Sequence, residues 1–157
     1  MQSIPAPFDT DAVGDLRDDW LASAESDVAR HVLDDPAASS VLDCIFGNSP
    51  FLSQAVIRDP GFVCELLCAG PDKAFSQVLS NISDKSKESL NDNDIARILR
   101  VAKRRAAITI ALADIAGLWP LEKITGTLSQ FAGAALDLAV AHLLRQAAGQ
   151  GAFELRH

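Results

Sequence analysis

Apolar residues recur every three or four positions in the second half of the chain, and this spacing predicts two long helices. The first is expected over about 94–116 and the second over about 120–148, with Gly117-Leu118-Trp119-Pro120 as the turn. In the second helix the apolar stripe consists of Leu121, Ile124, Leu128, Phe131, Ala135 and Leu138. A short turn between two such helices predicts a long antiparallel helical hairpin over 94–148.

Prolines divide the first half of the chain into shorter predicted helices. One helix is expected from about 10 to 31, and the next begins at Pro36 and ends at Gly47-Asn48. Pro50, Pro60 and Pro71 can each begin a further short helix. Proline is tolerated in the first turn because the amide proton that it lacks would have no partner there.

Three segments show no helical periodicity. Residues 80–93 are polar and predict a loop that ends in an asparagine cap, Asn91 or Asn93. Residues 1–8 contain two prolines and are expected to form a loose arm, while residues 149–157 leave the last helix through glycines toward a strand-like end. The chain therefore predicts one all-α domain, 1–157, with several short helices followed by the long hairpin.

Composition limits the partners and the location of the protein. The 157 residues are 48% apolar but only 6% aromatic, with a formal charge of −7. This charge repels phosphate groups, so we expect no nucleic acid and no membrane as a partner. The most apolar stretch, 106–119, falls short of the roughly twenty residues that cross a bilayer. The first twenty residues do not resemble a signal peptide and the three cysteines are odd in number, so we expect a cytoplasmic protein.

Two groups of charged residues are candidates for contacts. Lys103, Arg104 and Arg105 form the only basic run in this acidic chain and could contact a partner protein or a phosphate. Solvation or pairing within the chain is the favoured alternative. Asp114 lies in an apolar helix and is expected to be a buried structural carboxylate whose hydrogen-bond donor comes from another helix.

Cysteine and histidine residues were considered as metal ligands or catalytic groups. Cys64 and Cys68 are four residues apart and would share a helix face, but further zinc ligands could come only from Cys44, His31 and His142. Small buried apolar side chains are therefore the favoured interpretation of the two cysteines. Asp137 and His142 point about 140° apart on one helix and cannot pair directly. We predict no catalytic, cofactor-binding or metal-binding residue in this chain.

Two segments carry a resemblance to a known family. They are SPFLSQAVIRDPGFVCELL, residues 49–67, and KRRAAITIALADIAGLWPLEKITGTLSQFAGAALDLAVAHLLRQ, residues 103–146. Together they resemble the helical N-terminal region of the bacterial bifunctional glutamine synthetase adenylyltransferase/adenylyl-removing enzyme, also called glutamate-ammonia-ligase adenylyltransferase. The similarity covers about two thirds of the chain, from 49 to 148 with a weaker middle.

The resemblance implies that the chain is a non-catalytic piece of a larger enzyme. In that family the helical region leads into a nucleotidyltransferase fold, with a glycine-rich turn, Glu-Leu-Asn and a metal-binding Ser-Asp-x-Asp motif. The chain ends at His157 without these motifs, so no catalytic residue can be transferred to it and 149–157 is expected to be a truncated lead-in to a missing domain. The parent enzyme adenylylates and phosphorolytically deadenylylates a tyrosine of glutamine synthetase, using Mg and ATP/ADP, under control of glutamine and the PII protein.

Three hypotheses therefore stand beside one another. The first is a helical segment that packs on its own downstream nucleotidyltransferase domain, with glutamine synthetase and PII as partners of the parent enzyme. The second is a free-standing helical protein-interaction module whose apolar groove binds a partner helix. The third is a small helical enzyme that uses His142 with a carboxylate.

Overall fold

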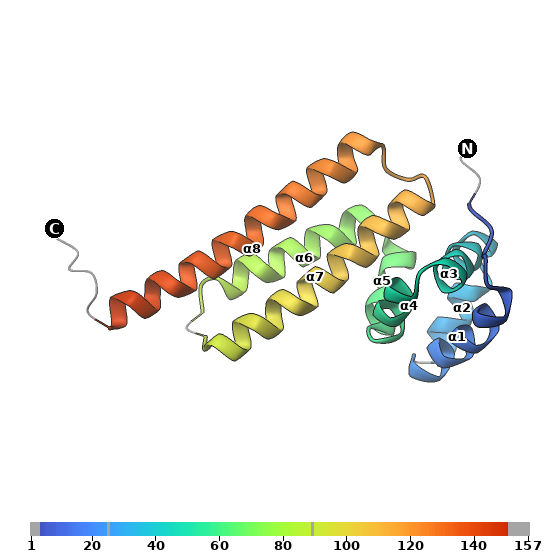
Figure 1. The fold of residues 1–157 in the computed structure, drawn as a ribbon, viewed down its shortest axis with the longest axis horizontal. Coiled ribbons are helices and arrows are strands. Elements are labelled where there is room, and N and C mark those ends of the chain that lie inside the picture. The colour runs from blue at the N-terminus through green and yellow to red at the C-terminus, as the bar shows by residue number, and fades with distance from the viewer. Residues whose placement is uncertain (1–3, 25, 89, 151–157) are drawn as a thin grey trace.

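The computed structural model describes residues 4–24, 26–88 and 90–150, and this part of the chain is all helical (Figure 1). Its helices are α1 (Thr10–Ser23), α2 (Ser26–Leu33), α3 (Pro36–Asn48), α4 (Pro50–Ile57), α5 (Pro60–Ala69), α6 (Pro71–Lys85), α7 (Asp92–Ile115) and α8 (Leu121–Gly149). No strand occurs among these residues, so the all-α prediction is confirmed. Of the expected strand-like end, 149–157, Gly149 ends α8 and Gln150 caps it, and residues 151–157 lie outside the described residues.

The helices form two groups in an elongated molecule. Helices α1 to α5 cluster at one end, and α6, α7 and α8 pack against one another as a three-helix bundle that extends to the other end (Figure 1). Contacts of α7 with α4 and α5, and of α6 with α5, join the two groups. Residues buried in both groups form one hydrophobic core, from Trp20 in α1 to Leu138 in α8.

The prediction of a single helix over 10–31 is wrong, because this segment forms two helices, α1 and α2. Ala24 has an extended backbone, with φ −91° and ψ 160°, although its N–H still bonds the Trp20 carbonyl. This break redirects the chain, so that the apolar side chains of both helices reach the core, with Trp20 and Ala29 fully buried. The cap of α1 is Asp9, whose side chain accepts a hydrogen bond from the N–H of Ala12.

Each proline predicted to begin a helix does so. Helices α3, α4, α5 and α6 start at Pro36, Pro50, Pro60 and Pro71. Gly70 separates the last two with φ +85°, a left-handed conformation that glycine adopts without steric cost. The sequence therefore specified this series of short connected helices through its turns.

The loop expected over 80–93 is shorter than predicted. Helix α6 continues to Lys85, because Val78 and Ile82 lie on one face and are both buried against the core. Asn91 caps α7 as expected, with its Oδ1 accepting from the N–H of Asp94 at 3.0 Å.

Helices α7 and α8 lie within a few residues of their predicted bounds and are joined through Gly117, which has φ +64°. Helix α8 contacts α6 as well as α7, so the expected hairpin is part of a three-helix bundle. Trp119 fixes the start of α8: its ring packs edge-on against Phe75, and its indole N–H donates to Asp72 at 3.4 Å. With 29 residues, α8 is roughly 43 Å long.

A loose arm was not found for residues 4–8 of the expected segment 1–8. These residues are held against the end of α3. The N–H of Phe8 donates to the Asn48 side chain at 3.2 Å, and that side chain donates to the carbonyl of Ala6 at 3.2 Å. The N–H of Asp9 donates to the Gly47 carbonyl at 3.1 Å. These bonds hold the segment because a helix end leaves polar backbone groups open to such partners.

Candidate interaction surface

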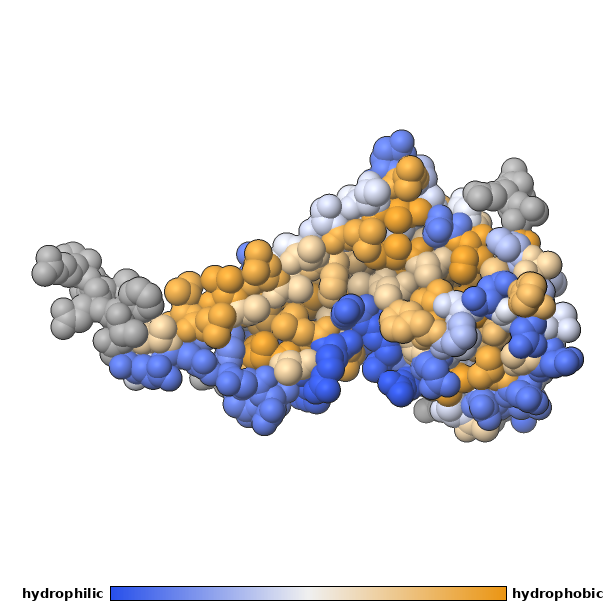
Figure 2. All heavy atoms as spheres, in the orientation of Figure 1, coloured by the Kyte–Doolittle hydropathy of each residue, from blue (hydrophilic) through white to orange (hydrophobic). Residues whose placement is uncertain are grey.

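Helix α8 exposes a long apolar side to solvent. Only Thr127, Leu138 and His142 are buried along its length. The exposed large apolar side chains of α8, between 43% and 71% exposed, are Leu121, Leu128, Leu136, Val140, Leu143 and Leu144. Figure 2 shows hydrophobic residues along α8, whereas hydrophilic residues gather along the lower edge of the same view. We call these six residues the outer face of α8.

The outer face arises because α8 carries apolar residues on two sides. Ile124, Phe131 and Leu138 repeat every seven residues and pack toward the core. Leu136 and Leu143 are also seven residues apart, but they point about 150° away from Leu138. A helix that is apolar on opposite sides is typical of a buried environment, and a contiguous exposed apolar patch typically marks a contact surface.

The apolar stripe predicted on one face of the last helix is divided in the structure. Ile124, Phe131 and Leu138 face inward, whereas Leu121 and Leu128 are 71% and 50% exposed. These two leucines lie between about 40° and about 100° round the helix from the inward residues, toward the side that α6 and α7 do not cover. The repeat of seven in Leu136 and Leu143 was present in the sequence and would have indicated a second face.

By length and composition alone, α8 is also able to span a membrane, and it is the one helix of the described residues that meets this criterion. The stretch singled out from the sequence, 106–119, belongs instead to the end of α7 and to the turn that follows it. A core helix of a soluble protein meets the same criterion, so this is weak support for a membrane span. Exposed Asp137 in the middle of α8 would be costly in a bilayer, which favours a protein contact.

The residues of the basic run have different environments. One is exposed to solvent, and two form an ion-pair cluster with Asp59 that we call the Asp59 clamp. Lys103 is exposed, whereas Arg104 and Arg105 both contact Asp59 at the start of α5. Arg105 donates to the two carboxylate oxygens at 2.7 and 3.0 Å, and Arg104 donates to one of them at 3.3 Å. The Arg105 guanidinium also lies 4.9 Å from the centre of the Phe62 ring. These contacts tie α7 to the N-terminal group of helices.

The charges of the clamp reinforce one another. Burial alone would raise the pKa of Asp59, but hydrogen bonds and charge attraction from Arg105 and Arg104 outweigh it, and the pKa is lowered. The hydrogen bond to Asp59 in turn raises the pKa of Arg105. Two of the three basic residues are therefore paired within the chain.

Asp114 is exposed, so the expectation of a buried carboxylate is wrong. The preceding residue, Ala113, is fully buried, and Asp114 lies about 100° further round α7. This position is in the last turn of the helix, where the chain leaves toward α8 and one side remains open to water. The apolar neighbours in the sequence belong to the opposite face of the helix.

The cysteines and His142 do not come together. Cys64 is buried and Cys68 is exposed, and burial raises the pKa of the Cys64 thiol. His142 is buried and pairs with Asp92 at the start of α7, not with Asp137. Within the described ranges, no three histidine, cysteine or carboxylate side chains converge in a way that could hold a metal ion.

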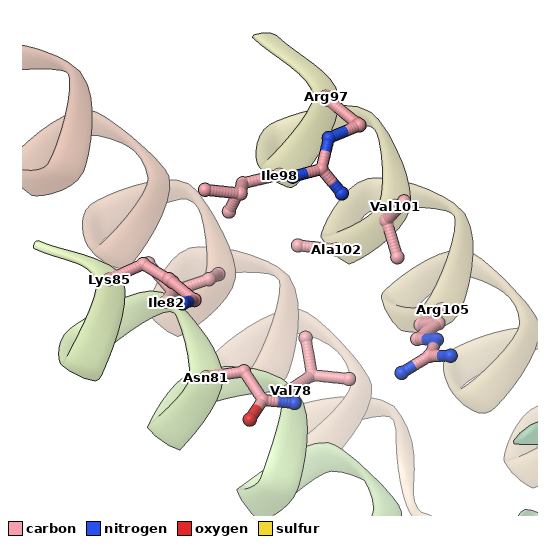
Figure 3. Close-up of a pocket in the computed structure, with 9 residues that line it drawn as sticks. All are labelled: Val78, Asn81, Ile82, Lys85, Arg97, Ile98, Val101, Ala102 and Arg105. Carbon is pink, nitrogen blue, oxygen red and sulfur yellow. The ribbon is translucent and has the colours of Figure 1, made fainter. Parts of the chain in front are cut away.

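A hollow of about 150 Å³ lies between α6 and α7, and Figure 3 shows the side chains that face it. Its apolar residues are Val78, Ile82, Ile98, Val101 and Ala102, and its polar residues are Asn81, Lys85, Arg97 and Arg105. Arg97 and Arg105 stand at its two ends along α7 (Figure 3). Sequence reasoning missed this hollow because its two walls come from separate helices.

Known proteins similar to this chain form one group. A family model described as glutamate-ammonia ligase adenylyltransferase matches residues 40–157. The bifunctional glutamine synthetase adenylyltransferase/adenylyl-removing enzyme of Bradyrhizobium sp. (strain ORS 278) is 34% identical over 136 residues, which are 85% of this chain and 14% of that protein. The protein of the same name from Bartonella quintana (strain Toulouse) is 36% identical over 116 residues, 73% of this chain and 12% of that protein.

A third relative of the same name, from Rhodopseudomonas palustris (strain BisB5), is 33% identical over 137 residues, again 85% of this chain and 14% of that protein. The chain thus spans 12 to 14% of the length of these relatives. No solved structure matches the chain.

Proposed function

Because the chain belongs to the glutamate-ammonia ligase adenylyltransferase family, we propose that it acts as a non-catalytic helical segment of such an enzyme. In this proposal the outer face of α8 packs on the nucleotidyltransferase domain of the same polypeptide. The parent enzyme regulates glutamine synthetase in the cytoplasm by adding and removing an adenylyl group on a tyrosine. The segment itself contributes packing and, through the parent enzyme, access to glutamine synthetase and the PII protein.

The single observation that carries the proposal is the outer face of α8. Six large apolar residues stay in water when the 157-residue chain stands alone. The curated relatives are several times longer than the chain, so a polypeptide of that kind has ample sequence to cover the face. Burial of such an apolar patch is favourable by about 25 cal/mol for each Å² of apolar surface that is removed from water.

The Mg and ATP/ADP chemistry of the parent enzyme belongs, in this proposal, to the rest of the polypeptide. Magnesium and nucleotide phosphates are held by converging carboxylates together with basic or backbone donors. The clamp of Arg104 and Arg105 is directed at Asp59 and offers no carboxylate for a metal. The described residues contain no group of three histidine, cysteine or carboxylate side chains that fits a magnesium ion, and we derive no catalytic step from them.

A first experiment measures the intact mass of the natural gene product in cell extracts with an antibody against this domain. We expect a product several times heavier than 16.7 kDa. A product of 16.7 kDa would contradict the proposal and favour the alternative, a free-standing helical interaction module that uses the same face for a partner helix.

A second experiment measures binding of the chain to the separately produced nucleotidyltransferase part of the same gene product by isothermal titration calorimetry. The double variant Leu136→Ser/Leu143→Ser should weaken binding about tenfold or more, because two buried leucines contribute well over 1.4 kcal/mol. Phe51→Ser is the matched control, since Phe51 is 66% exposed on α4, away from α8. Equal loss in both variants, or no binding of the unchanged chain, would contradict the proposal.

A further inference from the structure

The hollow between α6 and α7 combines an apolar floor with a cationic end. Val78, Ile82 and Val101 supply apolar surface from both helices. The two helices are joined by a short loop and run antiparallel, so Lys85, in the last turn of α6, lies at the same end of the hollow as Arg97 of α7 (Figures 1 and 3). A group that contacts this end therefore meets an ammonium and a guanidinium.

No carboxylate lines the hollow, although the chain carries a formal charge of −7. The carboxylates that pair with the two cations lie outside it: Glu88 for Lys85 at 2.8 Å and Asp94 for Arg97 at 3.6 Å. Both pairs are solvent-exposed, with Arg97 68% and Lys85 45% exposed in their side chains. Exposed ion pairs contribute little to stability, so these cations can turn to another anion at little cost.

Arg105 closes the other end of the hollow in a different way. Its guanidinium is held by both oxygens of Asp59 and packs on Phe62, so its donors are engaged and its position is fixed. Arg97 and Arg105 are eight residues apart on α7, about 12 Å along the helix axis. The hollow thus has one end with available positive charge, an apolar middle and a closed far end.

We propose that this hollow binds a small anion with a short apolar body, such as an alkyl carboxylate or alkyl phosphate. The acidic group lies between Lys85 and Arg97, and the alkyl part covers Ile82, Ile98 and Val101. Charge-assisted hydrogen bonds supply recognition of the acid, and burial of the alkyl part supplies much of the affinity. A ligand this small binds with a dissociation constant of about 1 mM.

The test titrates the isotopically labelled 157-residue chain with four probes and follows its amide NMR signals. Hexanoate and hexyl phosphate carry the anion, while hexanol and hexylammonium share the alkyl chain without it. We expect saturable shifts at residues 78–85 and 97–102 with hexanoate, hexyl phosphate or both. The acid that binds more tightly identifies the preferred group.

Charge reversal at the cationic end tests the role of Arg97. Arg97→Glu should weaken binding of the preferred acid about tenfold or more, because the substitution replaces an attractive guanidinium by a carboxylate that repels the acid. Arg100→Glu is the matched control: Arg100 is an exposed residue of the same helix that does not line the hollow, and its variant should differ less than twofold. Lys85→Glu is a second variant, in case Arg97→Glu alters the fold.

Three results would overturn the proposal. The first is no saturable shift with either acid. The second is equal binding of hexanol or hexylammonium, because the cations would then play no part. The third is a set of shifts confined to the outer face of α8, which would place binding elsewhere. None of these results depends on whether α8 packs on a nucleotidyltransferase domain.

Discussion

The Nε2 atom of His142 lies 2.6 Å from the Oδ1 atom of Asp92, which joins the far part of α8 to the start of α7. His142 is buried, whereas the Asp92 side chain is 77% exposed. Gln146, one turn further along α8, donates a hydrogen bond to the same Asp92 oxygen. A single carboxylate thus receives two donors from the last turns of α8.

Removal of this carboxylate should loosen the far part of α8. In Asp92→Ala, we expect faster backbone hydrogen exchange over about 139–149, because His142 and Gln146 lose their shared acceptor, and little change in α3 or α4. The measurement is amide exchange by NMR or mass spectrometry. Asp94→Ala is the control, since Asp94 also lies in the first turn of α7 but pairs with Arg97. The same exchange pattern in both variants would count against a specific role for Asp92.

Asp92 should also titrate at an unusually low pH. The hydrogen bond from His142, and then that from Gln146, lower the pKa of Asp92 from its ordinary value of 3.8. A lowered pKa in the folded state means that the stabilisation is present above the ordinary aspartate range and is lost as pH falls through the lowered value. The carboxyl ¹³C titration of Asp92 should shift to higher pH in His142→Phe, and an unchanged midpoint would refute this reading of the contact.

The Asp59 clamp should contribute measurably to stability. Asp59→Ala leaves Arg104 and Arg105 partly buried without their acceptor, and should lower the free energy of unfolding by about 2 kcal/mol. Lys103→Ala, from the same basic run but exposed, should change it by less than about 0.5 kcal/mol. Urea unfolding followed by circular dichroism measures both values at neutral pH. Because the pKa of Asp59 is lowered, its contribution is present at neutral pH and is lost in acid.

The two sides of α8 should respond differently to substitution in the isolated chain. Leu138 is fully buried, and Leu138→Ala should cost about 3 kcal/mol through lost contacts and a cavity. Leu136→Ala, at a position that is 63% exposed, should cost less than about 0.5 kcal/mol beyond the measurement error. Urea unfolding compares the two directly. A large cost for Leu136→Ala would mean that the outer face is already covered, for instance by a second copy of the chain.

Gly47 should not tolerate a side chain. A Cβ atom at this position would lie 2.3 Å from the Pro7 Cβ and 2.9 Å from the Pro7 Cα, so residues 4–9 would have to move. Gly47→Ala should therefore be destabilising by about 1 kcal/mol despite the better helix propensity of alanine. Gly14→Ala, also within a helix but with open space around it, should be neutral or stabilising. Thermal unfolding of both variants checks the difference in sign.

Local sequence signals predicted much of the fold. The prolines at 36, 50, 60 and 71 and the cap at Asn91 act within one helical turn, so their effect is readable from neighbouring residues. The break after Ser23 and the extension of α6 to Lys85 depend on what the helices pack against. That information lies in tertiary contacts, which a periodic pattern does not contain.

The candidate surfaces were less predictable for the same reason. Burial of Asp114 was inferred from apolar neighbours in sequence, but neighbours along a helix point in different directions and Asp114 faces water. Asp59 and Asp92 gain their roles from residues more than forty positions away. The possible contact of Lys103, Arg104 and Arg105 with a partner or phosphate stays a prediction, with two of these residues engaged by Asp59.

Because α8 is long, a change at one of its two attachment points has a large effect on the position of the other end. The helix is anchored at its start by Trp119, and at the other end by the His142 and Gln146 contacts with Asp92. Over roughly 43 Å, a tilt of about 10° at the first anchor displaces the far end by about 7 Å. A small rearrangement around Trp119 and Asp72 would therefore cause a larger displacement at the far end of α8. The contacts at Asp92 determine how far that end can move.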